Sequence, residues 1–138
     1  MTRCDAHSAE EGDSVRRQVG LEAMRRHIEQ LIADVASDEV SIYPVKRLDQ
    51  AQILRAEESG EVLELRLPAI RSARSYATAL HEFGHLKGRY QNSRCTMVRE
   101  RAARRWARQN ALIWSDAMER EATKSLAWYE GYSRFSAL

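Results

Sequence analysis

The chain has 138 residues, of which 43% are hydrophobic and 30% charged, and its net charge is +2 at pH 7. This length suits one domain with a modest core and leaves no room for a second full domain. No apolar run approaches the roughly 18 residues that a membrane span needs, and the N-terminus lacks the apolar stretch of a signal peptide. We therefore expect a cytoplasmic protein without membrane contact, with a flexible leader over residues 1–12 and a single domain over residues 13–138.

Arginine supplies nearly all of the positive charge, because only three of the 22 basic residues are lysines. A net excess this small is weak evidence for an acidic partner, since nucleic-acid-binding proteins usually concentrate a larger excess on one face. The two cysteines, Cys4 and Cys95, lie far apart in the sequence and are expected to be unpaired thiols.

The first predicted element is an amphipathic helix over residues 13–36, in which apolar residues recur every three or four positions. The stretch VSIYPV favours a short strand, and its proline, which cannot donate a ladder hydrogen bond, favours the edge of a sheet. Residues 52–56 and 61–67 predict a hairpin, because leucines alternate with other side chains in the second segment and EESGE supplies a turn.

Three further helices are predicted after Pro68. Ser72 can cap the first of them, which runs to Lys87, and Gly88 is expected in the left-handed conformation that often ends a helix. The second helix covers about residues 97–113. The order of elements predicts an α+β domain with a small three-stranded antiparallel sheet.

The last two helices differ in their patterns. The helix over residues 97–113 carries Ala103, Ala107 and Asn110 on one stripe, and arginines occupy its other faces: Arg101, Arg104, Arg105 and Arg108. The final helix begins near Ser115, where Asp116 and Glu119 have the spacing of a capping box, and it is expected to run to Glu130 and end at Gly131.

The segment SYATALHEFGHLKGRY, residues 75–90, carries the most specific motif. His81 and His85 are four residues apart, so on a helix their imidazoles lie on one face about 6 Å apart and can bind the same cation, most readily zinc. Glu82 lies roughly 100° around the helix, where it can reach a water on the metal but is badly placed as a ligand. The alternative is that both histidines are ordinary polar residues of an amphipathic helix.

Gly84 lies between these two histidines. A glycine inside a helix costs up to about 1 kcal/mol relative to alanine. We therefore expect another element to approach the helix closely at this position.

A catalytic zinc site needs a third protein ligand and an open position for water. The metzincin extension HExxHxxGxxH is excluded, because Gln91 stands at its final histidine and glutamine is a poor zinc ligand. Glu100 is the favoured ligand, since it shares the predicted buried stripe of Ala103 and Ala107, where an unpaired carboxylate is costly. Two alternatives stay open: Glu100 is a first-turn residue favoured by the helix dipole, or Cys95 is the third ligand.

The segments YATALHEFGHLKG and VRERAARRWARQNAL resemble the ImmA/IrrE-type zinc metallopeptidases, small zincin-like domains common in phages, mobile elements and bacterial regulators. In that family the HExxH helix is followed by a helix that begins E-x-x-A-x-x-aromatic-A, and the matching positions are Glu100, Ala103, Trp106 and Ala107. The resemblance covers about residues 40–115. One departure is Arg104, because many thermolysin-like zincins place there an acid that orients a histidine, so this support must come from elsewhere.

By this resemblance, His81, His85 and Glu100 are zinc ligands and Glu82 is the general base of a zinc-dependent metallopeptidase. Its expected substrate is a specific cytoplasmic protein, such as a repressor or another regulator. Glu82 takes a proton from water activated by zinc and later delivers it to the leaving amine. A strand such as residues 61–67 is expected to bind an extended substrate by adding it as another strand.

The residue that stabilises the oxyanion is left open among four tyrosines, each of which also suits a packing role: Tyr76, Tyr90, Tyr129 and Tyr132. His7 and His27 have no partner at ligand spacing and are expected to be incidental.

Two other functions remain alternatives. The first is a zinc-binding module that docks a partner without catalysing a reaction. The second is a nucleic-acid-binding domain that uses the arginines of residues 97–113 with Trp106 and Trp114, and we expect nucleic acid to be the less favoured partner. Such arginines more often form a solvated face paired with acids, here Glu119 or Glu121.

Overall fold

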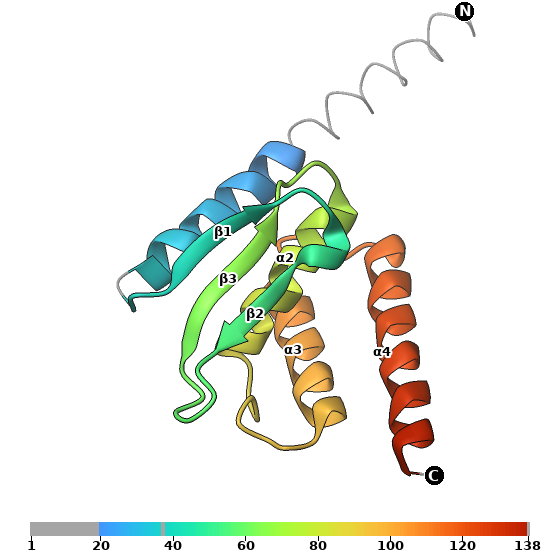
Figure 1. Cartoon of the computed structure of the whole chain (residues 1–138). Coiled ribbons are helices and arrows are strands. Elements are labelled where there is room, and N and C mark those ends of the chain that lie inside the picture. Colours follow the sequence, from blue (N-terminus) through green and yellow to red (C-terminus); the bar gives the residue numbers. More distant parts are fainter. Residues whose placement is uncertain (1–19, 37, 138) are drawn as a thin grey trace, which may run out of the picture.

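The computed structural model describes residues 20–36 and 38–137, with side chains described up to residue 127 except at residue 125. The predicted leader lies outside the described residues, as do Cys4 and His7. A helix over residues 20–36 comes first, and the later elements are β1 (Ser41–Val45), the short 3-10 helix η1 (Leu48–Gln50), β2 (Gln52–Arg55), β3 (Val62–Pro68), α2 (Ala73–Lys87), α3 (Thr96–Asn110) and α4 (Asp116–Ala137). The described part of the chain is thus an α+β arrangement of four α-helices and one small sheet (Figure 1). None of its helices combines the length and the apolar character that crossing a membrane requires.

The sheet is mixed, so the predicted all-antiparallel sheet is wrong. Its strand order is β1-β3-β2, and β3 pairs antiparallel with β2 but parallel with β1. The predicted hairpin is confirmed, and so is the edge position of β1, which contains Pro44. The antiparallel prediction fails because the chain does not turn back tightly after Val45: the segment that contains η1 spans two strand spacings, about 10 Å, to reach the far edge.

β3 takes the central position because it carries the most apolar face of the sheet. Leu65 and Leu67 are buried, and they pack with Met24, Ile28 and the apolar face of α2 in one core. The helix over residues 20–36 and α2 lie on the same face of the sheet (Figure 1). Because β3 has a partner on both sides, the expectation that residues 61–67 add a substrate as another strand is wrong; the free edges belong to β1 and β2.

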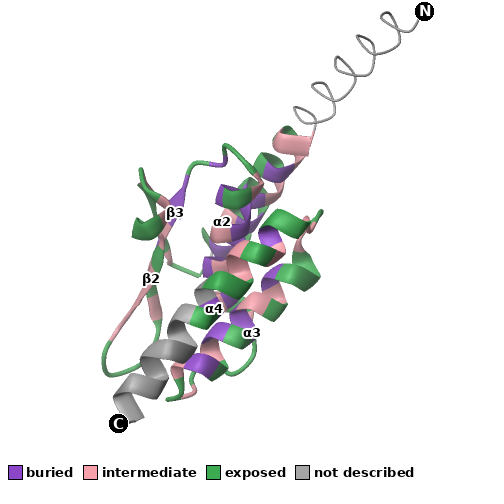
Figure 2. Cartoon of the chain, turned by 90° about the vertical axis from the view of Figure 1, so that its right-hand side faces the viewer, coloured by how far each residue is buried: buried purple, intermediate pink, exposed green. Residues whose placement is uncertain are grey.

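α2 and α3 approach each other closely along a face of small residues. A Cβ placed on Gly84 would lie 2.3 Å from the Ala103 carbonyl oxygen, closer than real Cβ contacts. A Cβ on Gly88 would lie 3.2 Å from the Ala102 carbonyl oxygen. Figure 2 shows buried residues gathered on α2 and on the side of α3 that faces it. The expectation that another element approaches α2 at Gly84 is therefore confirmed.

Ser72 caps α2, as the sequence predicts: its side chain accepts a hydrogen bond from the Ser75 N–H. The prediction for Gly88 is wrong, because its φ of −72° is not left-handed, and the left-handed residue is Tyr90 with a φ of 59°. Gly88 is needed for lack of space rather than for its backbone conformation, because a Cβ there would lie 2.5 Å from the Gly84 carbonyl oxygen as well as 3.2 Å from the Ala102 carbonyl oxygen of α3. On α3, Asn110 is exposed and does not belong to the buried stripe.

The start and end of α4 also differ from the prediction. The Ser115 hydroxyl accepts a hydrogen bond from the Met118 N–H, so Ser115 is the capping residue and the predicted capping box of Asp116 and Glu119 is wrong. The helix continues through Gly131 to Ala137, since a single glycine costs a helix only about 1 kcal/mol.

His27 contributes to the fold and is not incidental to it. Its Nδ1 lies 2.6 Å from the hydroxyl of Tyr76, a side chain that is fully buried. The same hydroxyl accepts a hydrogen bond from the Leu112 N–H at 3.0 Å. Tyr76 thus connects the helix over residues 20–36, α2 and the segment between α3 and α4.

Replacing Gly84 with alanine should destabilise the protein. The new methyl group meets a backbone carbonyl that cannot move alone, and overpacking of this kind costs about 1–3 kcal/mol, more than the helix propensity that alanine returns. Urea denaturation measures the change in the free energy of unfolding. Gly20→Ala is the matched control, because a Cβ there has nothing within 4 Å. Equal stability of Gly84→Ala and the wild type would contradict the contact with Ala103.

Candidate metal centre

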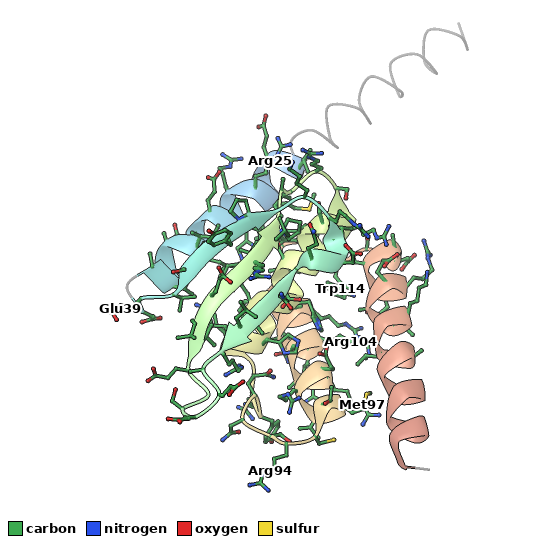
Figure 3. All side chains as sticks on the ribbon, viewed as in Figure 1. Arg25, Glu39, Arg94, Met97, Arg104 and Trp114 are labelled. Carbon is green, nitrogen blue, oxygen red and sulfur yellow. The ribbon has the colours of Figure 1, made fainter. Side chains whose placement is uncertain are left out.

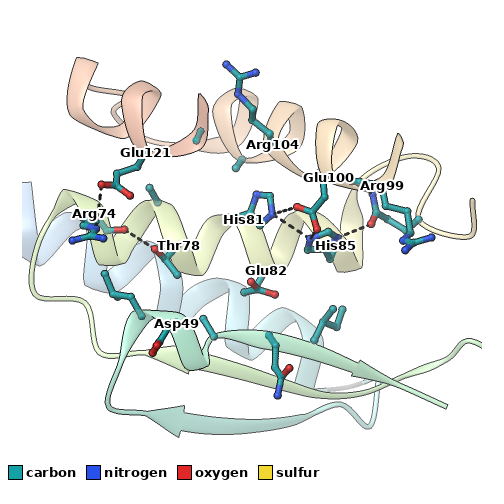
Figure 4. A pocket seen from close by; sticks show the side chains of 18 of the residues that line it. Asp49, Arg74, Thr78, His81, Glu82, His85, Arg99, Glu100, Arg104 and Glu121 are labelled. Carbon is teal, nitrogen blue, oxygen red and sulfur yellow. Dashed lines mark hydrogen bonds and ion pairs between the residues drawn. The ribbon is translucent and has the colours of Figure 1, made fainter. Parts of the chain in front are cut away.

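A cavity of about 580 Å³ lies between the sheet edge and the helices. η1 and β2 form one wall, and α2, α3 and the first turns of α4 form the others (Figure 4). Both histidines of the HExxH motif line this cavity, as do Glu82 and Glu100. The helices and the sheet edge therefore enclose a space large enough for part of a peptide.

His81 and His85 project from the same face of α2. Their ring centroids are 4.7 Å apart, the rings meet edge to face, and the two Nε2 atoms are 3.2 Å apart. Gly84 and Gly88 lie on this face as well, because residues three, four and seven positions apart share one side of a helix. The two imidazoles therefore stand where α3 comes closest to α2.

Glu100 reaches the histidine pair from α3. Its Oε2 lies 2.7 Å from His81 Nε2 and its Oε1 lies 3.2 Å from His85 Nε2, so each carboxylate oxygen faces one ring (Figure 4). Glu100 is only 7% exposed, and the first turn of α3 contains no acidic residue. The alternative that Glu100 is a first-turn residue favoured by the helix dipole is therefore wrong, whereas its predicted burial is confirmed.

These three side chains could hold a metal ion. Their ligand atoms all lie within 4.8 Å of one another. Bonds of 2.0–2.1 Å in a tetrahedral zinc site place ligand atoms about 3.3 Å apart. The two histidine Nε2 atoms are 3.2 Å apart, and each lies 2.7 or 3.2 Å from a different oxygen of Glu100. Two imidazole nitrogens and one carboxylate also match the ligand types that zinc prefers. The donor set therefore fits zinc.

The electrostatics of the cluster favour positive charge at its centre. Burial alone would raise the pKa of Glu100, but the hydrogen bonds from His81 and His85 outweigh burial and lower that pKa to about 2. Burial acts to lower the pKa of His85, but the hydrogen bond and negative charge of Glu100, together with Gln91 and Glu82, outweigh it, so this pKa is raised. A buried carboxylate between two rings is stabilised only when a proton or a metal cation lies between them.

Glu82 occupies a separate place in the same cavity. Its carboxylate points from α2 toward the sheet, on the other side of the histidines from Glu100 (Figure 4). The residue is 8% exposed, and burial raises its pKa more than the neighbouring His81 and His85 lower it. Glu82 is therefore outside the ligand cluster but within electrostatic range of it, as the HExxH spacing predicts.

Several other candidates do not reach the cluster. Cys95 is exposed at the start of α3 and is not among the clustered ligands in the described residues, so the structure does not support it as the third ligand. Tyr76 and Tyr90 do not line the cavity. The side chains of Tyr129 and Tyr132 lie outside the described residues.

Arg104 does not orient a metal ligand. Its guanidinium donates to Glu119 on α4, and the Trp114 Nε1–H donates to the same carboxylate at 2.5 Å. Arg104 and Trp114 are both labelled in Figure 3. Glu121 pairs instead with Arg74 at 3.4 Å. The expected pairing of arginine with acids on α4 is thus observed for Arg104, and this cluster fixes the start of α4 against α3.

The sequence reasoning missed Gln91 as a contributor to the site. Rejected as a ligand, it accepts a hydrogen bond from His85 Nδ1 at 2.9 Å through its Oε1. Its position could have indicated this role, because Gln91 follows His85 by six residues in a short loop that must stay near the end of α2.

No family model, curated protein or solved structure matches this chain. The resemblance to the ImmA/IrrE-type metallopeptidases therefore depends on the quoted motifs alone.

Removing Glu100 should weaken zinc binding. We expect Glu100→Ala to lower zinc affinity more than about 100-fold, because losing a direct ligand exceeds the 10–100-fold effect of supporting residues. Competition with a chromophoric chelator measures the dissociation constant, and circular dichroism checks the fold. The control is Glu58→Ala in the exposed turn between β2 and β3. Unchanged zinc affinity in Glu100→Ala would remove Glu100 from the site.

Cys95→Ser tests the alternative ligand. Because Cys95 is exposed and lies outside the cluster, the substitution should leave zinc affinity within about twofold of the wild type. The same chelator competition gives the measurement. A loss as large as that of Glu100→Ala would make Cys95 the third ligand instead.

Proposed function

We propose that this protein is a zinc-dependent metallopeptidase. The observation that carries the proposal is one cavity that holds both a two-histidine, one-glutamate cluster and a second buried carboxylate, Glu82, outside that cluster. Zinc peptidases with HExxH helices need these two parts, three ligands and a separate base. We also propose that the protein has a zincin-like fold and belongs to the ImmA/IrrE-type family.

The protein groups have distinct roles in the proposed reaction. Zinc, held by His81, His85 and Glu100, would supply a Lewis acid that makes water more acidic and polarises the peptide carbonyl. Glu82 accepts the proton of the attacking water and delivers it to the leaving nitrogen when the peptide bond breaks. Its raised pKa suits this role, because a general base works best when its pKa approaches the working pH.

The substrate would lie along β2. This strand has a free edge, and Gln52, Ile53 and Arg55 of β2 line the cavity. An extended peptide can add to such an edge through main-chain hydrogen bonds, which bind many sequences in one orientation. We propose a specific cytoplasmic protein as the substrate, such as a repressor or another regulator, on the basis of the family resemblance.

A zinc-binding module without activity remains the alternative, because the ligand cluster alone would serve it equally well. The two proposals differ in what they require of Glu82, which has no part in binding the metal. For nucleic-acid binding, no described feature adds support: Trp106 and Trp114 pack against the core, and Arg104 is paired.

Glu82→Gln should abolish cleavage and leave zinc bound. The amide keeps the size of the side chain but cannot accept the proton, so kcat should fall by about 10²- to 10⁴-fold. Degradation of an unfolded protein such as casein, followed by mass spectrometry of its fragments, measures the activity. Zinc content is measured in parallel.

Glu58→Gln on the exposed β2–β3 turn is the matched control and should cleave like the wild type. If Glu82→Gln cleaves at the wild-type rate, Glu82 is not the base. A wild type that binds zinc but cleaves neither casein nor any candidate regulator favours the module without activity.

A further inference from the structure

We infer that Gln91 is a positioning residue of the metal centre, which holds the His85 ring in the tautomer that leaves Nε2 free to bind a cation. The inference rests on the proposed zinc site and adds a supporting residue to it. Gln91 lies in the loop between α2 and α3, and its amide makes three hydrogen bonds: to the His85 ring, to the Arg89 carbonyl and to the Arg99 carbonyl.

The surroundings of Gln91 determine which way its amide points. One end of the amide lies 3.0 Å from the Arg89 carbonyl oxygen and 3.0 Å from the Arg99 carbonyl oxygen. Both neighbours only accept hydrogen bonds, so this end must be the NH₂ group. The oxygen end must therefore be the one that faces His85 at 2.9 Å.

The orientation of the amide in turn fixes the His85 tautomer. An amide oxygen only accepts, so His85 Nδ1 must carry a proton and donate it. In the neutral ring the other nitrogen, Nε2, then carries a lone pair. That nitrogen lies 3.2 Å from Glu100 Oε1 and 3.2 Å from His81 Nε2, in the centre of the ligand cluster. Gln91 therefore presents to the metal the nitrogen that can bind it.

The loop geometry indicates that this contact is built into the fold. Tyr90, immediately before Gln91, has a left-handed φ of 59°, a conformation that costs a non-glycine residue free energy. The Arg99 carbonyl that Gln91 binds belongs to the residue before Glu100. One amide thus links a ring on α2 to the backbone beside the ligand on α3.

The backbone of His85 is held from the other side. An Arg55 guanidinium nitrogen donates to the His85 carbonyl oxygen at 2.6 Å, and another donates to the Gly60 carbonyl oxygen at 2.9 Å. The last turn of α2 is therefore anchored to the β2–β3 hairpin while Gln91 orients the ring. Many thermolysin-like zincins orient a histidine with an acid at the position of Arg104. In this chain Gln91 and Arg55 support His85 instead.

Zinc affinity of two Gln91 variants tests the inference. Gln91→Ala removes the amide, and Gln91→Met keeps the length of the side chain without its carbonyl acceptor. Each should raise the zinc dissociation constant about 10–100-fold in chelator competition, the range found for residues that orient metal-binding histidines. Gln109→Ala, an exposed glutamine on α3, is the matched control and should bind zinc like the wild type.

The tautomer itself can be observed in the wild type, so the test does not depend on a variant that folds. Long-range ¹H–¹⁵N NMR of the zinc-loaded protein should show the proton of His85 on Nδ1 and the metal on Nε2. The opposite assignment would overturn the inference. In Gln91→Met the Nδ1 proton should exchange with solvent faster than in the wild type.

The two proposals fail separately. Zinc affinity within about twofold of the wild type in both Gln91 variants overturns the role of Gln91 and leaves the proposed peptidase unaffected. A wild type that binds zinc with the predicted tautomer but cleaves no substrate overturns the peptidase and supports the role of Gln91. Failure of the wild type to bind zinc would overturn both the metal site and the role of Gln91 in it.

Discussion

The contact between Gly84 and the Ala103 carbonyl determines how near α3 can come to α2, and the metal-ligand geometry depends on that distance. His81 and His85 flank Gly84 on one helix, and Glu100 lies one turn before Ala103 on the other. A side chain at position 84 would push the helices apart and draw the carboxylate away from both rings. Metal-ligand distances tolerate errors of only about 0.2 Å. Gly84 therefore sets the distances between the ligand atoms, although a glycine lowers the stability of the helix.

The ligand cluster lowers the stability of the fold. A buried glutamate held between two imidazoles contributes less to folding than apolar side chains of similar volume would, because three polar groups must be desolvated. The core beneath it, formed by Leu65, Leu80 and Phe83 among others, is largely apolar and supplies the rigidity that the site needs. The buried carboxylates of Glu82 and Glu100 both line the cavity.

Local patterns in the sequence predicted those features that depend on neighbouring residues. The helix that holds the HExxH motif, its Ser72 cap, the β2–β3 hairpin and the burial of Glu100 all follow from periodicity or spacing within a few turns. The parallel pairing of β1 with β3 did not follow, because strand order is decided by which strand buries the most apolar face against distant helices. Gln91 was missed for a similar reason: its role depends on two carbonyls that only the folded loop brings together.

The position of β3 has a consequence for how the chain assembles. β3 is the last strand in the sequence but the middle strand of the sheet, so β1 and β2 do not pair with each other. During synthesis from the N-terminus, about 20 residues after β1 must leave the ribosome before that strand has any partner. Until then the apolar face of the helix over residues 20–36 has no sheet to cover and stays exposed on the nascent chain.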